Sequence, residues 1–271
     1  MSSKKLIIYG DSYAEDPNLV SWASQLAGKL KIPMLNRGLS GTSIEYSIKY
    51  FIKDKLSNTI SDNDTVIFIF SSPGRHHLKY QNKFPRTASI FSYGKSSNGH
   101  NINDITYYQE NKEHIKWYEA NKDDGIFKVN ASAYLHMLIN YARSKPDVTF
   151  MVLYMDILLH PIELPILDNF LISNISLRQL SNNEFGCDVY FNSFVKKVIA
   201  DPRYNHLTIP NISIFADLIH KAILTKDTSI ITYDKFLRGI LDKNLLSQKD
   251  YLYFIDRGLL YNNERYMDRL R

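Results

Sequence analysis

The residues whose types and spacing suit chemistry lie in polar loops that follow short apolar runs. Ser12 stands in the sequence LIIYGDSY, residues 6–13, immediately after the first of these runs. A second loop, NRGLSGTS, occupies residues 36–43, and a third, SSPGRHH, occupies residues 71–77. In open α/β folds, ligands bind where the carboxyl ends of parallel strands open into loops. The sequence therefore predicts that the Ser12 hydroxyl lies at such an edge.

Local patterns around Ser12 predict the elements that position it. Residues 6–9 are wholly apolar and long enough for a buried parallel strand, and Gly10 permits backbone angles that other residues resist. Asp16 followed by Pro17 is typical of a helix cap and a first helical residue. Apolar residues then recur with the period of a helix, at Leu19, Val20, Trp22, Ala23, Leu26, Ala27 and Leu30.

The same alternation of strand and helix continues along the chain. Thr42 and Glu45 have the spacing of a capping box, which predicts a helix from Ile44. Asn130 is expected to cap a later helix, and Asp62-Asn63-Asp64 reads as a turn. Runs rich in β-branched and aromatic residues predict further buried strands. These strands are expected at residues 32–36, 65–70 and 148–154.

The remaining segments are less regular. Residues 76–126 show no sustained periodicity and are too long for a simple connection, which predicts a lid or a partner-binding insertion. Residues 156–200 are ambiguous, with short helical patterns at 167–171 and 191–199. An amphipathic helix is expected from Ile212 to Ile223. Helical segments are expected near Asp234 and, capped by Ser247 and Asp250, at 251–259.

Together these elements predict an α/β fold with a mostly parallel sheet and helices on both faces. GDS after the first strand, N-x-x-x-S-G after the second and a late histidine resemble the SGNH/GDSL hydrolases. The resemblance covers roughly residues 5–75 and 200–224. It implies a three-layer α/β/α, flavodoxin-like domain over residues 1–230, including the insertion. Residues 231–271 would then be a helical C-terminal extension.

The resemblance also implies roles for individual residues. Ser12 would be the nucleophile, and its backbone N–H would help to bind the oxyanion. Gly41 would present a second N–H there, because a side chain would hold the substrate oxygen away from the donor. His206 would accept the serine proton. Each residue also has a purely structural interpretation: a helix cap for Ser12, an ordinary loop glycine for Gly41 and a surface histidine for His206.

Two positions depart from the family pattern. Pro73 stands where the third block has an asparagine, and proline has no donor to offer the oxyanion. Arg75 is a candidate substitute because a guanidinium stabilises developing negative charge, although a salt bridge within the insertion explains it equally well. Arg203 replaces the aspartate expected three residues before the histidine. Asp201 is then either the acid that orients His206 or a solvated charge or cap.

These residues favour a serine esterase. Its substrate would be an acyl or acetyl ester of a small molecule or a glycan. The alternative is an SGNH-fold structural or interaction protein with impaired catalysis, phage-encoded and associated with a virion. Protein assembly would then use the 76–126 insertion or the C-terminal helices. Neither interpretation requires a cofactor, and the spacing of the histidines predicts no metal site.

Composition limits the other classes of function. The formal net charge is +5 with a pI near 9.0, and basic residues are scattered, which predicts no nucleic-acid-binding surface. Cys187 is the single cysteine, so the chain forms no internal disulfide and suits a reducing compartment. No apolar run approaches the ~20 residues that span a bilayer, and no secretory signal is visible. A cytoplasmic protein is the resulting expectation.

Overall fold

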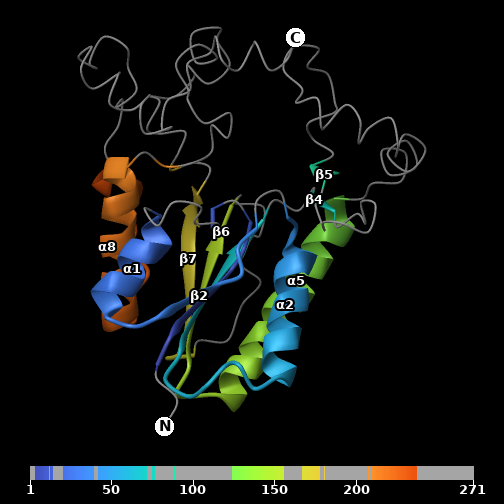
Figure 1. Ribbon diagram of the computed structural model, residues 1–271. Helices are drawn as coiled ribbons and strands as arrows, with labels where there is room; N and C mark the ends of the chain where they lie inside the picture. The colour runs from blue at the N-terminus through green and yellow to red at the C-terminus, as the bar shows by residue number, and fades with distance from the viewer. Residues whose placement is uncertain are drawn as a thin grey trace, which may run out of the picture. The chain divides into compact units, whose positions relative to one another are not determined.

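The computed structural model (Figure 1) divides the chain into two compact units, Met1–Asn174 and Ile175–Arg271. The domain boundary predicted between residues 230 and 231 stays a prediction. The residues that the structure describes are 4–11, 13–14, 21–39, 42–71, 75–76, 88–89, 124–155, 167–177, 180, 207 and 209–236.

The described residues form a five-stranded sheet with the order β2-β1-β3-β6-β7. The first four strands in this order pair in parallel, with Leu6 opposite both Met34 and Thr65, and Thr65 opposite Thr149. β1 and β3 are buried at every position, as expected for strands covered on both faces. The strands are β1 (Leu6–Tyr9), β2 (Met34–Asn36), β3 (Thr65–Phe70), β6 (Thr149–Tyr154) and β7 (Phe170–Ser176).

Numbered along the chain, the strands of this sheet run 2-1-3-4-5, which is the doubly wound order of the flavodoxin-like fold. The predicted fold class is therefore confirmed. In this order the chain turns back between β1 and β3, and ligands of such folds bind outside the carboxyl ends of those two strands. That point is where the GDS turn follows β1.

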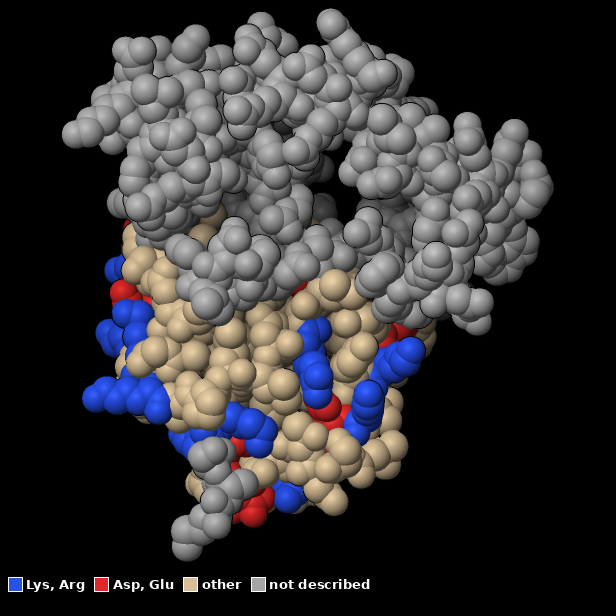
Figure 2. Space-filling model, viewed as in Figure 1, with Lys and Arg blue, Asp and Glu red and all other residues tan. Residues whose placement is uncertain are grey.

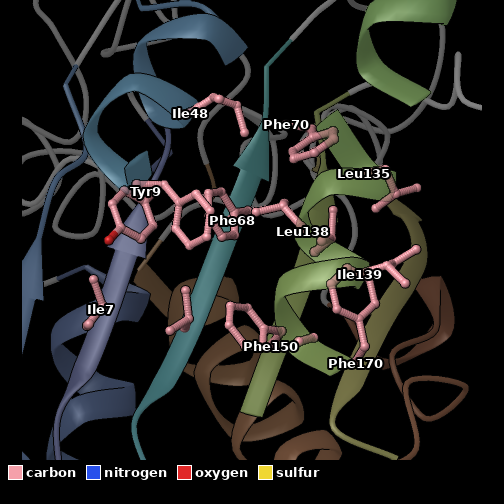
Figure 3. Packing of buried hydrophobic residues seen from close by; sticks show 14 of the residues in the cluster. Ile7, Tyr9, Ile48, Phe68, Phe70, Leu135, Leu138, Ile139, Phe150 and Phe170 are labelled. Carbon is pink, nitrogen blue, oxygen red and sulfur yellow. The ribbon is translucent and has the colours of Figure 1, made fainter. Parts of the chain in front are cut away.

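Helices cover both faces of the sheet (Figure 1). α2 (Ile44–Leu56) and α5 (Asp124–Ser144) lie on one face, and α1 (Trp22–Leu30) lies on the other. Figure 3 shows the core between the sheet and the helices α2 and α5. Aromatic rings from the strands meet aliphatic side chains from these two helices there. The largest members of this core include Tyr9, Phe51, Phe68, Phe70 and Phe150.

The helix starts were predicted with mixed success. α1 begins at Trp22, after Ser21 in an extended conformation whose Oγ accepts from Ser24 N at 3.2 Å, so this helix starts later than expected. Asp16 and Pro17, the predicted cap and first helical residue, lie outside the described residues. α2 begins at Ile44 as predicted, but its N-cap is Ser43 and no capping box forms. The Thr42 hydroxyl is instead used in the preceding loop, where it donates to Leu39 O at 2.7 Å.

One later prediction is corrected, and one ambiguous segment is assigned. α5 begins at Asp124, six residues before the expected cap at Asn130, so that asparagine lies inside the helix. Residues 156–200 were ambiguous, with a short helical pattern at 167–171, and in the structure Phe170–Ser176 form the strand β7. Within the 76–126 insertion, the described residues include His76, in the short strand β4 (Arg75–His76), and the strand β5 (Ala88–Ser89), which pairs antiparallel with β4.

In the second unit, α8 (Ile209–Thr225) contains the helix predicted at residues 212–223. Its buried face includes Phe215, which lies 6.2 Å from the ring of Phe236. Near Asp234 the described residues form a single 3₁₀ turn, η3 (Tyr233–Lys235), and the residues that follow Phe236 lie outside the described part of the chain. The helical patterns at residues 191–199 and 251–259 lie outside the described residues.

Two surface properties of the described residues bear on partners. No helix among them is long and apolar enough to cross a membrane. Figure 2 shows that basic and acidic side chains are interspersed over the visible described face. Two ion pairs among the described residues are Arg37–Asp54 and Lys145–Asp62.

Candidate functional site

The turn after β1 is organised by Asp11, which is fully buried. Its Oδ1 accepts from Tyr13 N at 3.0 Å, and its carbonyl accepts from Ala14 N at 3.0 Å. An aspartate that accepts from the backbone two residues ahead forms an Asx turn. Asp11 is therefore a structural turn residue. Ser12, next in the sequence, lies outside the described residues.

The loop after β2 runs beside this turn. Arg37 N donates to Ile8 O at 2.8 Å, and Leu39 N donates to Gly10 O at 3.2 Å. Thr42 Oγ1 lies 3.4 Å from Gly10 O as well as bonding Leu39 O. The NRGLSGTS loop thus continues the pairing of β2 with β1 beyond the end of the sheet, which places the two polar loops side by side.

Asn36 joins the same two loops through its side chain. Its Nδ2 donates to Ala14 O at 2.6 Å, and its Oδ1 accepts from Gly38 N at 2.7 Å. The second of these bonds is another Asx turn, so β1 and β2 both open into a turn closed by an Asx side chain. Sequence reasoning missed this role, although an asparagine that ends a strand two residues before a glycine is a recognisable turn signal.

A polar network lies on the α2 side of the sheet. Arg37 Nε and Nη2 bind the two carboxylate oxygens of Asp54 at 3.0 and 2.8 Å, and Tyr9 OH donates to Asp54 Oδ2 at 2.9 Å. Burial and the Asp54 charge raise the pKa of Tyr9, while the hydrogen bond to Asp54 raises the pKa of Arg37. Tyr9 also stacks on Phe68. The network ties the end of β1 to the loop after β2 through α2.

This environment predicts an alkaline limit to stability. Because its pKa is raised, folded Tyr9 keeps its proton at pH values where the unfolded chain releases it. Its stabilising contribution is complete below about pH 10 and is lost as pH rises further, by about 1.4 kcal/mol per pH unit. We expect Tyr9→Phe to show a shallower loss of unfolding free energy between pH 9 and 11 in urea titrations. Parallel profiles for the variant and the wild type would contradict this assignment.

Gly10 is required by packing. A Cβ on this residue would lie 2.8 Å from the Cβ of Ile69 and 2.9 Å from the Cβ of Ala14. We expect Gly10→Ala to lower the free energy of unfolding by about 1–3 kcal/mol, because an extra methyl group has no room. Gly28→Ala is the matched control in urea titrations. A Cβ there meets nothing within 4 Å, and alanine favours the helix, so this variant should be no less stable than the wild type.

The third polar loop is described only in part. Ser71 directly follows β3 and is buried, and its Oγ has no hydrogen-bond partner among the described residues. Arg75 is the first residue of β4, opposite Ser89, and its side chain lies outside the described part of the structure, as does Pro73. The predicted contribution of Arg75 to an oxyanion site therefore stays a prediction.

The other predicted site residues also stay predictions. Gly41, Asp201 and His206 lie outside the described residues, so their proposed meeting with Ser12 is untested. What the structure adds is the framework of the two loops: Asn36, Arg37, Asp54 and Thr42 were not singled out as functional in the sequence. Across the described residues, no group of three or more His, Cys, Asp or Glu side chains has the arrangement of a metal site.

A surface hollow of about 580 Å³ lies elsewhere, between the C-terminal half of α2 and the outer face of α5. Its lining includes Lys55, His136 and Tyr141, and the Lys55 ammonium lies 5.0 Å from the ring centre of Tyr141. α2 ends near the amino edge of the sheet, so this hollow is separate from the loops around Gly10. We assign the candidate chemistry to the loops because they carry the polar groups of the carboxyl edge.

No protein-family model matches the chain, and no curated protein matches it. Two solved structures do. A member of the lipolytic protein G-D-S-L family from Veillonella parvula DSM 2008 is 15% identical over 55% of this chain, with a TM-score of 0.29, and the match spans 57% of that protein. A structure assigned to the same family, from Desulfitobacterium hafniense DCB-2, is 14% identical over 80% of this chain and 98% of its own, with a TM-score of 0.31. The chain is thus similar to G-D-S-L family structures, while its fold assignment rests on the strand order and register described above.

Proposed function

We propose that this protein is a serine hydrolase of the SGNH type that removes an acyl group from an ester. The observation that carries the proposal is the position of the GDS turn. It follows β1 at the reversal point of a 2-1-3-4-5 sheet, and residues 37–39 of the next polar loop run beside it, with hydrogen bonds to Ile8 O and Gly10 O. This edge is where folds of this class bind their ligands.

The proposed reaction has two steps. Ser12 Oγ attacks the ester carbonyl carbon while its proton passes to His206, and the resulting oxyanion accepts from the N–H groups of Ser12 and Gly41. The bond from carbon to the leaving oxygen breaks, and that oxygen takes the proton from His206. Water then attacks the acyl-enzyme with the same histidine as base, which releases the carboxylic acid and restores Ser12. Asp201 is the candidate to orient the imidazole.

The described residues support this proposal through the way they fix the turn. Asp11 closes it from within, and the Trp22 indole donates to Tyr13 O at 2.8 Å from the side of α1. A nucleophile requires a defined direction, since a displacement of about 1 Å costs on the order of 10²-fold in rate. A small acyl group such as acetyl, on a glycan or another alcohol, is the proposed substrate class.

Labelling with a fluorophosphonate probe tests the proposal directly. Such a probe phosphonylates an activated serine, so intact-mass analysis of the full chain should show one adduct, and peptide mapping should place it on Ser12. Ser12→Ala should show no adduct. Ser144→Ala is the matched control, because Ser144 ends α5 at the opposite edge of the sheet and bonds only locally, to Tyr141 O. Absence of labelling in the wild type, together with no turnover of short-chain aryl esters, would overturn the proposal and favour a scaffold without catalysis.

A further inference from the structure

Among the described residues, the Asn36 side chain makes the shortest side-chain hydrogen bond between the two loops of the candidate site. Its Nδ2 to Ala14 O distance of 2.6 Å spans 22 positions of sequence, and its Oδ1 at the same time fixes the first turn of its own loop at Gly38. One planar amide therefore sets the distance between the end of the Asp11–Ala14 turn and the start of the Gly38–Thr42 loop.

The neighbouring side chains that the structure describes make other links. Thr42 Oγ1 approaches Gly10 O at 3.4 Å, before the Asp11–Ala14 turn begins. The Arg37 guanidinium points to Asp54, and so connects its loop to α2. Trp22 connects the Asp11–Ala14 turn to α1 through Tyr13 O. The backbone hydrogen bond from Leu39 N to Gly10 O lies before the Asp11–Ala14 turn and does not contact Ala14. Asn36 makes the contact with Ala14 O.

We propose that Asn36 is a positioning residue that holds the Ser12 turn against the Gly41 loop through its amide bridge between Ala14 O and Gly38 N. This inference rests on the proposed hydrolase function, in which both loops supply N–H groups to one oxyanion. An oxyanion site of this kind works only when its donors keep a fixed separation. Asn36 touches no reacting atom in this proposal and acts through the two loops.

Asn36→Asp is the informative variant because it is nearly isosteric. Its carboxylate still accepts from Gly38 N, but an ionised oxygen faces Ala14 O at a distance where the wild type has an N–H donor. When the carboxyl is protonated, its O–H donates to Ala14 O and restores the bridge. Partial burial and the facing carbonyl oxygen disfavour the ionised form and so raise the pKa of this carboxyl. The bridge should therefore be absent at pH 8 and begin to return as pH falls to 5.

The control makes the same substitution at the opposite edge of the sheet. Asn169 Nδ2 donates to Ala142 O, Lys145 O and Val148 O at 3.0 Å each, next to the start of β6. Asn169→Asp therefore places a carboxylate against three carbonyl oxygens and should destabilise the fold at least as much. It contacts neither loop of the candidate site, so its labelling rate should stay within about twofold of the wild type.

The experiment measures the rate of fluorophosphonate labelling for the full chain and each variant at pH 5, 6, 7 and 8, with urea unfolding midpoints alongside. We expect Asn36→Asp to label about 10–100-fold more slowly than the wild type at pH 8. The ratio of its rate to the wild-type rate should rise as pH falls. Taking this ratio cancels the effect of titrating the catalytic base, which both proteins share. Asn36→Ala, the second variant, should be slow at every pH because it has no group to protonate.

The outcomes separate this inference from the proposed function. A wild type that does not label overturns the hydrolase proposal and this inference with it. A wild type that labels, with Asn36→Asp and Asn36→Ala at the wild-type rate, overturns only the positioning role. A pH-independent deficit in Asn36→Asp that matches the deficit in Asn169→Asp also overturns it, because general destabilisation then explains both.

Discussion

Replacing Ser12 by alanine is expected to lower the kcat for a short-chain aryl ester by at least about 10³-fold. Alanine has no oxygen with which to form an acyl-enzyme, so only the catalysis supplied by oxyanion donors and binding remains. KM should change little, because the hydroxyl is used in bond formation rather than in holding the substrate. Steady-state hydrolysis of p-nitrophenyl acetate, corrected for the buffer rate, gives both constants.

His206→Ala should produce a deficit of similar size, and combining it with Ser12→Ala should add little, because a nucleophile and its base act as a unit. Ser144→Ala, at the far edge of the sheet, should keep the wild-type constants. A Ser12→Ala protein within threefold of wild-type turnover would show that the hydrolysis arises from another nucleophile. The proposed site would then be wrong even for a chain with esterase activity.

The largest effect on stability is expected from Asp54→Ala. The Asp54 side chain is 2% exposed, and it accepts from both Arg37 and the buried hydroxyl of Tyr9. Removing the carboxylate leaves a guanidinium and a phenol without their acceptor, and breaking a buried ion pair costs about 3–5 kcal/mol. The Arg37 side chain is 31% exposed and regains some water, which reduces the expected loss of unfolding free energy to about 2–4 kcal/mol. Urea denaturation at pH 7 measures it.

The surface pair of Lys145 and Asp62 offers a matched comparison, with a similar distance of 3.0 Å but side chains that are 37% and 62% exposed. Asp62→Ala should therefore change the free energy of unfolding by less than about 1 kcal/mol.

In the double variant Tyr9→Phe/Asp54→Ala, the loss of unfolding free energy should be smaller than the sum of the single losses, because both substitutions remove the same contact. Additive losses would show that Tyr9 and Asp54 contribute independently.

Strands were the most predictable part of this protein. Residues 65–70 were predicted with the observed bounds, and β6 differs from its prediction by one residue, because an unbroken apolar run has few alternatives to a buried strand. β7 was missed because its sequence, FLISNIS, mixes polar with apolar residues. Its first residues share helical spacing with Leu167, so local periodicity favoured the wrong element.

The sequence by itself determined the alternation of strands and helices, and with it a parallel sheet whose carboxyl edge carries the GDS turn. The tertiary structure decided the strand order, the partner of Asp54 and the bridge made by Asn36. Tyr9 and Asp54 are 45 residues apart, and Asn36 and Ala14 are 22 apart. Such contacts depend on how the elements pack in space, so no pattern within one element specifies them. Thr42 is a further example. Local spacing assigned its hydroxyl to a helix cap, but in the structure this hydroxyl donates to Leu39 O.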